Sequence, residues 1–190
     1  SSFLHDYLMK KNLPNKQNSQ GKKTAFDNML ERLSSKQLKK DIKAAAKSVG
    51  EEGDIFLQLS LHPTIEIAAR ASWAYRDWAI LYPEKSRKLS PKVIQTLHKT
   101  TNGSVIRNLL GAFLYQGFPK SVYVRLLEVC MYHFTRNGYA IAVYANILGI
   151  FADIAKVHPE IKQEVLLLAE RHPMNDQSGF IVRLRAVATA

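Results

Sequence analysis

Helical segments recur in pairs after Gly50, and this rhythm constrains the fold more than any other feature of the chain. Corresponding places in the second segment of each pair lie 37, 37 and 39 residues apart, at Arg70, Arg107, Tyr144 and Arg183. A repeat of this length is typical of helical solenoids, in which each unit covers the apolar face of its neighbour. The sequence therefore predicts an all-α solenoid of about four stacked helix pairs.

Helix-breaking residues separate the two segments of a pair. The steps His62-Pro63, Asn137-Gly138 and His172-Pro173 each end one segment before the next begins. Apolar residues recur at every third or fourth position within the segments, and no segment alternates with the period of two that a strand would show. We therefore expect helices over residues 52–61 and 64–82, 91–99 and 103–116, 120–135 and 139–157, and 160–171 and 177–188.

The residues ahead of the repeats predict one or two further helices. Thr24 followed by Asp27 is the pattern of a capping box, and Ser35 is placed to cap a second helix. Lysines form one stripe of this second helix, which we interpret as a solvated surface: Lys36, Lys39, Lys40, Lys43 and Lys47.

The beginning of the chain differs in composition from the rest. Residues 12–23 are polar and include Pro14 and Gly21, which is typical of a linker. We therefore divide the chain into an N-terminal arm or linker over residues 1–23 and a helical repeat domain over residues 24–190.

The cysteine count and the hydropathy pattern exclude two classes of protein. A single cysteine cannot form a disulfide framework within the chain, and it fits a reducing compartment. The most apolar stretch, residues 139–152, has 14 residues, fewer than the roughly 20 that a membrane-spanning helix needs. The chain begins Ser1-Ser2 without a methionine, which suggests a processed or trimmed product. We expect a cytoplasmic monomer without a membrane span.

The second segment of the first pair carries the pattern apolar-x-x-Arg-Ala-x-x-Ala from Ile67 to Ala74, and a related run extends from Ser178 to Arg185. In these features the chain from Glu52 onward resembles HEAT-type repeats of the armadillo superfamily, as found in small bacterial proteins of about this length. The resemblance implies a right-handed α–α superhelix. It also implies a non-catalytic interaction or scaffold module, which presents a curved surface to a macromolecular partner, most simply a protein.

Two features depart from the HEAT pattern. Tyr144 stands where the repeat arginine is expected, and the aspartate that HEAT repeats often carry near the turn between helices is missing or displaced. These departures bear on the limits of the repeats more than on the fold.

Some of the small proteins that this chain resembles carry an adenylosuccinate lyase label. Residues 14–18 match the Pro-x-Lys-x-Asn part of the lyase signature, but Lys10, Lys11 and Asn12 stand where its Gly-Ser-Ser is required. Such a short match arises easily by chance, and the lyases are much longer and build each site from several subunits. We therefore expect no lyase activity and no catalytic residue.

The charge of the chain favours an anionic partner. Lysine and arginine total 27 against 16 acidic residues, a net charge of +11. Residues 85–127 contain no acidic residue at all. This segment spans the second pair, so its cations are expected to lie together along the solenoid. We name six of them the basic set, a candidate surface for nucleic acid or another polyanion: Lys85, Arg87, Lys88, Lys92, Lys99 and Arg107.

A second candidate site combines Trp73, Asp77 and Arg107. Trp73 and Asp77 are one helical turn apart, so both can face the same side of a helix. The pair resembles the tryptophan and aspartate of HEAT-like alkylpurine DNA glycosylases, which use an arginine from the next repeat. This resemblance implies that Asp77 would stabilise positive charge on a sugar while aromatic residues hold the cationic base. The alternative is that Trp73 packs between repeats and Asp77 pairs with an arginine on its own helix.

The sequence gives little support for a metal site or a catalytic nucleophile. The histidines do not cluster, and His62, His158 and His172 each precede a proline at a helix end. Cys130 falls on the apolar face of its segment and is interpreted as a small core residue. The chain has no glycine-rich phosphate loop and no metal-ligand motif of the Cys-x-x-Cys or His-Glu-x-x-His type. We expect no metal and no cofactor.

Overall fold

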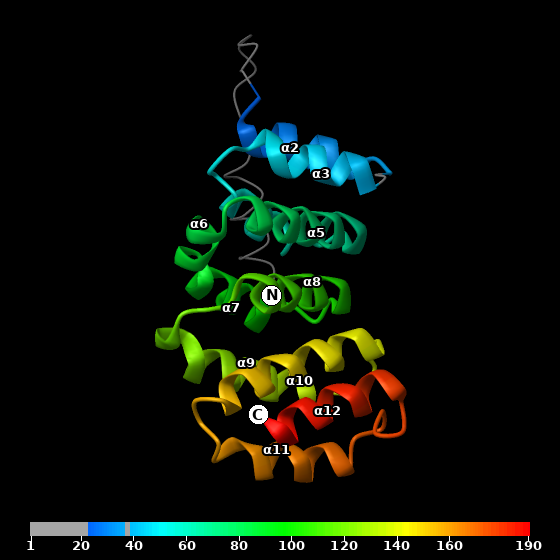
Figure 1. The fold of residues 1–190 in the computed structure, drawn as a ribbon. Helices are drawn as coiled ribbons and strands as arrows, with labels where there is room; N and C mark the ends of the chain where they lie inside the picture. The colour runs from blue at the N-terminus through cyan, green and yellow to red at the C-terminus, as the bar shows by residue number, and fades with distance from the viewer. Residues whose placement is uncertain (1–22, 37–38) are drawn as a thin grey trace, which may run out of the picture.

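The computed structural model describes residues 23–36 and 39–190. These residues form eleven α-helices and one short 3-10 helix, with no strand among them. Figure 1 shows helix pairs stacked along one axis, from α2 and α3 at the top to α11 and α12 at the bottom. The predicted all-α solenoid is confirmed. The predicted arm over residues 1–23 lies almost wholly outside the described residues and stays a prediction.

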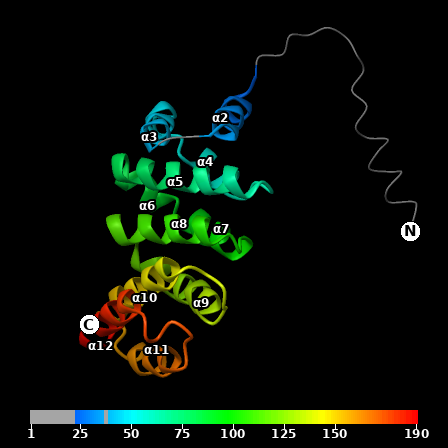
Figure 2. The same ribbon diagram turned by 90° about the vertical axis from the view of Figure 1, so that its right-hand side faces the viewer.

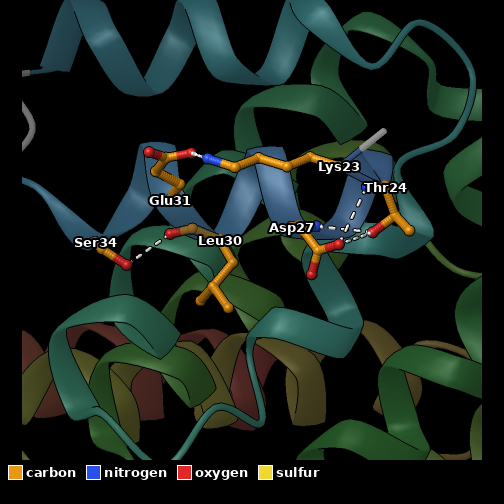
Figure 3. A network of polar contacts seen from close by, with 6 residues as sticks. All are labelled: Lys23, Thr24, Asp27, Leu30, Glu31 and Ser34. Carbon is orange, nitrogen blue, oxygen red and sulfur yellow. Dashed lines mark hydrogen bonds and ion pairs between the residues drawn. The ribbon is translucent and has the colours of Figure 1, made fainter. Parts of the chain in front are cut away.

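The stack begins with an additional pair, α2 (Ala25–Ser34) and α3 (Lys39–Ser48). The predicted capping box is present: the Thr24 hydroxyl accepts from the Asp27 backbone N–H at 3.1 Å, and the Asp27 carboxylate accepts from the Thr24 N–H at 3.1 Å (Figure 3). These hydrogen bonds from Thr24 hold the pKa of Asp27 below its usual value. Lys23 and Glu31 pair along the same helix at 2.6 Å.

Four further pairs follow, at the places that the sequence predicts. They are α4 (Asp54–Leu59) with α5 (Ile65–Leu81), α7 (Ser90–Lys99) with α8 (Gly103–Gln116), α9 (Tyr123–Phe134) with α10 (Ile141–Ala155), and α11 (Ile161–Glu170) with α12 (Ser178–Thr189). One short element between pairs was not predicted, α6 (Pro83–Lys88). The predicted helix over residues 120–135 begins with the 3-10 turn η1 (Lys120–Val122) and continues as α9.

The second helices of successive pairs form one layer of the molecule. Helix α5 packs along α3 on one side and α8 on the other, α10 follows α8, and α12 packs along α10. Figure 2 shows α5 and α8 lying side by side at the front of this layer. The first helices α4, α7 and α9 pack against one another in a second layer behind it. We call the outward side of the first layer the second-helix face.

Hydrogen bonds between neighbouring pairs join residues that are about one repeat period apart in the sequence. The side-chain amide of Asn102 donates to the Ile65 carbonyl, 37 residues earlier, at 3.2 Å. Asn108 donates to the Ser72 hydroxyl, 36 residues earlier, at 3.0 Å. Asn146 donates to the Arg107 carbonyl, 39 residues earlier, at 3.0 Å. Each of these bonds occupies a backbone or hydroxyl acceptor at a helix interface, so the second helices are held in a defined register.

The four residues that mark the repeat in the sequence have different surroundings. Arg70 reaches back to α2 and donates to the Leu33 carbonyl at 2.8 Å. Tyr144 is buried and donates to the Arg136 carbonyl at 2.6 Å. Arg107 and Arg183 are exposed. The four residues therefore share a position in the repeat but have no common set of contacts.

Within the part of the chain described above, no helix combines the length and the apolar character that crossing a membrane requires.

Candidate interaction surface

Trp73 and Asp77 lie one turn apart on α5, and both are half-buried. Trp73 packs against the hydrophobic core. Its Nε1 and the Oδ2 atom of Asp77 are shielded from solvent and have no hydrogen-bond partner among the described residues. Burial raises the pKa of the Asp77 carboxyl, while the cations of Arg76, Lys43 and Lys39 act in the opposite direction. Asp77 is therefore a carboxyl group among several cations, with one buried oxygen that has no hydrogen-bond partner among the described residues.

Arg107 does not reach this pair. The hydrogen bond from Asn108 to Ser72 places the start of α8 beside the first half of α5. Asp77 lies five residues beyond Ser72, about 7 Å further along α5 at 1.5 Å per residue. The nearest arginine of the pair is instead Arg76, whose Cδ lies against Gly111 of α8. The structure thus brings together Trp73 and Asp77 but not the predicted third member.

Acidic neighbours reduce the positive charge around the basic set in the folded chain. Stacking brings Glu51 beside Lys85 at 2.8 Å and Asp54 beside Lys92 at 3.3 Å. Within α6, Arg87 pairs with Glu84, which directly precedes the acid-free segment. All three pairs are solvent-exposed, so they contribute little to stability. They nevertheless reduce the local charge that a polyanion would meet.

The basic set also divides among elements. Its first three residues lie on α6 or its end, Lys92 and Lys99 lie on α7, and Arg107 lies on α8 in the other layer. Lys88, Lys99 and Arg107 form no ion pair within the described residues. The six cations are therefore spread over three helices.

Two clefts are lined by cations that the sequence analysis only partly identified. The first, which we call the turn cleft, measures about 440 Å³ and lies between the turns of the second and third predicted pairs. It is lined by residues 101–104 and Arg107 on one side, and by residues 136–140 and Val143 on the other. No acidic residue lines it. Arg136 was not in the basic set because it lies beyond the acid-free segment, although Asn137-Gly138 repeats the Asn102-Gly103 step.

The second cleft, which we call the outer groove, measures about 410 Å³ and lies between α7 and α9. Lys92, His98, Lys99 and Arg125 line it, together with Pro91, Ile94 and Gln95. It too has no acidic lining residue. Arg125 also lies within the acid-free segment. It was left out of the basic set because the sequence does not show that it lies in the same groove as Lys99.

The histidine and cysteine near the end of α9 are core residues. Cys130 is buried, and burial raises the pKa of its thiol. His133 is also buried: its Nε2 lies 2.8 Å from the Leu97 carbonyl, and its Nδ1 lies 3.0 Å from the Tyr139 hydroxyl. The carbonyl can only accept, so Nε2 carries the proton and Nδ1 accepts from Tyr139. In the described part of the chain, no group of three or more potential ligands is placed to hold a metal ion.

Exposed apolar side chains occur at one end of the second-helix face. Ile80 and Leu81 at the end of α5 are 40% and 45% exposed, and Tyr115 at the end of α8 is 68% exposed. The contact between Arg76 and Gly111 places Tyr115 level with Ile80 on the adjacent helix. These three residues, which we call the apolar end, therefore lie close together on neighbouring helices.

Comparison with known proteins supports the repeat architecture. A family model described as a HEAT repeat domain matches residues 26–179, which is most of the chain. Comparison with curated proteins and with solved structures gave no significant match.

Proposed function

Because this chain belongs to the HEAT repeat domain family, we propose that it is a non-catalytic interaction module whose second-helix face binds a macromolecular partner, most simply a protein. Among the described residues, no further helix layer packs over the outward side of α5, α8 and α10. A layered helical repeat offers such a surface because each pair covers only its neighbours. The single buried cysteine suits a cytoplasmic location, and the module would act as a monomer.

The observation that carries this proposal is the apolar end. Ile80, Leu81 and Tyr115 expose apolar area on adjacent helices of the family's repeat layer. Exposed apolar groups that cluster, rather than scatter, mark interaction sites on soluble proteins, and tyrosine is enriched among the residues that contribute most to binding. Arg76 borders this end and supplies a charged rim.

Affinity capture from the native cell, with chemical crosslinking, tests the proposal. The chain offers a matched pair of substitutions: Tyr115 on the second-helix face is 68% exposed, and Val124 on the first helix of the next pair is 70% exposed. We expect Tyr115→Glu to abolish recovery of the partner and Val124→Glu to leave it unchanged. Both positions are exposed, so both variants should fold. Equal recovery by the two variants would contradict the assignment of the second-helix face.

A glycosylase-type DNA repair protein remains the second candidate, and one observation favours it. Asp77 Oδ2 and Trp73 Nε1, one turn apart on α5, are both buried without a hydrogen-bond partner among the described residues. A carboxylate in that position could stabilise a cationic intermediate once a base occupied the site. The test is release of methylated purines from alkylated DNA by the full chain. Under this alternative, Asp77→Asn abolishes release and Asp153→Asn on α10 does not. No release by the parent protein would leave the interaction module as the sole candidate.

A further inference from the structure

The turn cleft combines two arginines with a lining that contains no acidic residue of the described chain. Its two arginines come from different repeats, Arg107 from α8 and Arg136 from the α9–α10 turn. Neither forms an ion pair within the described residues, and no carboxylate lines the cleft between them. Elsewhere the exposed cations at Lys85, Lys92 and Lys156 have acidic partners.

The two arginines are prepared for a ligand in different ways. Arg136 is held in place, since its Nη1 donates to the Tyr132 hydroxyl at 2.9 Å and its guanidinium lies 5.3 Å from the centre of that ring. The Arg107 side chain is exposed and makes no hydrogen bond with a described residue. A ligand would therefore meet one fixed guanidinium and one that is free to close on it.

Polar groups complete the lining. Asn137 is exposed and has no hydrogen-bond partner in the described part of the chain, so its amide can donate to a ligand. Asn102, by contrast, is used in the fold: it caps α8 by accepting from the Ser104 N–H at 3.0 Å and donates to the Ile65 carbonyl. Both arginines can only donate, and Asn137 and the hydroxyls of Thr101 and Ser104 can donate as well, which fits an acceptor with several oxygens.

We infer that the turn cleft binds a phosphorylated serine or threonine on the protein partner. The inference rests on the proposed function, because it supplies the chemistry of the partner segment. A phosphate monoester carries a charge of about −1.5 to −2 at neutral pH and three acceptor oxygens, which suits two guanidiniums from opposite walls. A carboxylate has half that charge and fewer acceptor sites.

Nucleic acid fits the turn cleft less well than a phosphorylated protein segment. Single-stranded chains bind through bases stacked on exposed aromatic rings and through a track of cations along the backbone. The aromatic residue lining this cleft, Tyr139, is buried, and the face of nearby Tyr132 is taken by Arg136. A compact cleft of about 440 Å³ with two arginines accommodates one phosphate and its flanking residues.

The test is a titration of the full ¹⁵N-labelled chain with a capped, glycine-flanked phosphoserine peptide, followed by amide NMR shifts. We expect saturable shifts at Gly103, Ser104 and Gly138, which line the cleft. The matched serine and glutamate peptides should cause much smaller shifts.

Arg107→Gln should weaken binding about tenfold, because a charge-assisted hydrogen bond is lost. Arg183→Gln is the control: this exposed arginine has the same place in the last repeat but lines no cleft described above.

Three results would overturn the inference. They are equal affinity for the phosphorylated and serine peptides, an unchanged affinity in Arg107→Gln, and a single-stranded oligonucleotide that shifts the same glycine signals at a lower concentration. Capture of the cellular partner separates this inference from the proposed function. If Arg107→Gln and phosphatase-treated extract both retain a partner that Tyr115→Glu loses, the interaction module stands and the phosphate site fails.

Discussion

Gly53 lies against the indole ring of Trp78, and this contact leaves no room for a side chain. A Cβ atom built at Gly53 would lie 2.1 Å from Trp78 Cδ2, and the tryptophan itself is fully buried. Trp78 cannot move easily, because its Nε1 also donates to the Gly50 carbonyl at 2.7 Å. We expect Gly53→Ala to lower the free energy of unfolding by about 2–3 kcal/mol, measured by urea denaturation.

Gly111 provides the matched control for this substitution. A Cβ atom there would meet the flexible Arg76 side chain at 3.4 Å and the Asn146 side-chain nitrogen at 3.7 Å, which is an ordinary van der Waals distance. Because glycine inside a helix costs roughly 0.5–1 kcal/mol relative to alanine, Gly111→Ala should be neutral or slightly stabilising. A Gly53→Ala variant as stable as Gly111→Ala would show that the Trp78 contact is not as tight as described.

Two buried histidines make stability depend on pH. Burial lowers the pKa of both His133 and His172 below the ordinary value of 6.5, although the hydrogen bond to the Leu97 carbonyl partly opposes this for His133. Their contribution to stability is therefore complete above about pH 6.5. As the pH falls below that value the unfolded chain takes up protons first, and the free energy of unfolding declines.

The measurement is urea denaturation between pH 7.5 and pH 5, in the parent chain and in His172→Phe. The His172 ring stacks on Phe134 and Phe180, so phenylalanine can occupy the same place. We expect this variant to lose part of the decline below about pH 6.5. An equal decline in the parent and in His172→Phe would show that other groups dominate.

The last helix pair is the element on which the rest of the stack most depends. Helix α12 packs extensively along α10, and the fully buried Phe180 of α12 stacks on Phe134 of α9. Ending the chain after Pro159 removes α11 and α12 and exposes the apolar side of α10 to water. We expect this truncation to lower the soluble yield and to cause aggregation, measured by light scattering. The full chain with Val182→Lys, at an exposed position of α12, should behave as the parent does. A soluble, equally stable truncation would contradict the stacked arrangement.

Most elements were predictable because their own residues specify them. The expected helix over residues 103–116 coincides with α8, since apolar spacing and the flanking glycines mark both of its ends. Helix α6 was missed because its residues are mainly charged and show no apolar face. It forms because Pro83 sets its first turn and because Ser86 is buried and hydrogen-bonded. The Ser86 hydroxyl lies 3.0 Å from the Tyr75 hydroxyl and accepts from the Gln116 side-chain amide at 2.6 Å. Such tertiary hydrogen bonds leave no local pattern.

For the molecule as a whole, the candidate surfaces were harder to predict than the fold. The acid-free segment suggested a continuous cationic surface, but stacking places Glu51 and Asp54 beside two of its lysines. Stacking also brings Arg136 into one cleft with Arg107, although 29 residues separate them. Helix periodicity is local and can be followed along the chain. The charge at a surface point depends on which repeats are neighbours, and a single sequence specifies this only after the register is known.

The outer groove leads to a prediction about polyanions that depends on this spatial arrangement. If Lys92, Lys99 and Arg125 contact the phosphates of duplex DNA, log K should fall with log salt with a slope of about −2.7, and binding should weaken roughly 40-fold between 50 and 200 mM salt. Fluorescence titrations of a labelled duplex measure this slope. Lys99→Gln combined with Arg125→Gln should reduce it to about −0.9, because two of the three contacts are lost. Lys85→Gln combined with Arg87→Gln changes the net charge equally but removes cations that do not line the outer groove, so the slope should change much less. Equal effects of the two double variants would mean that total charge, and not the groove, attracts the polyanion.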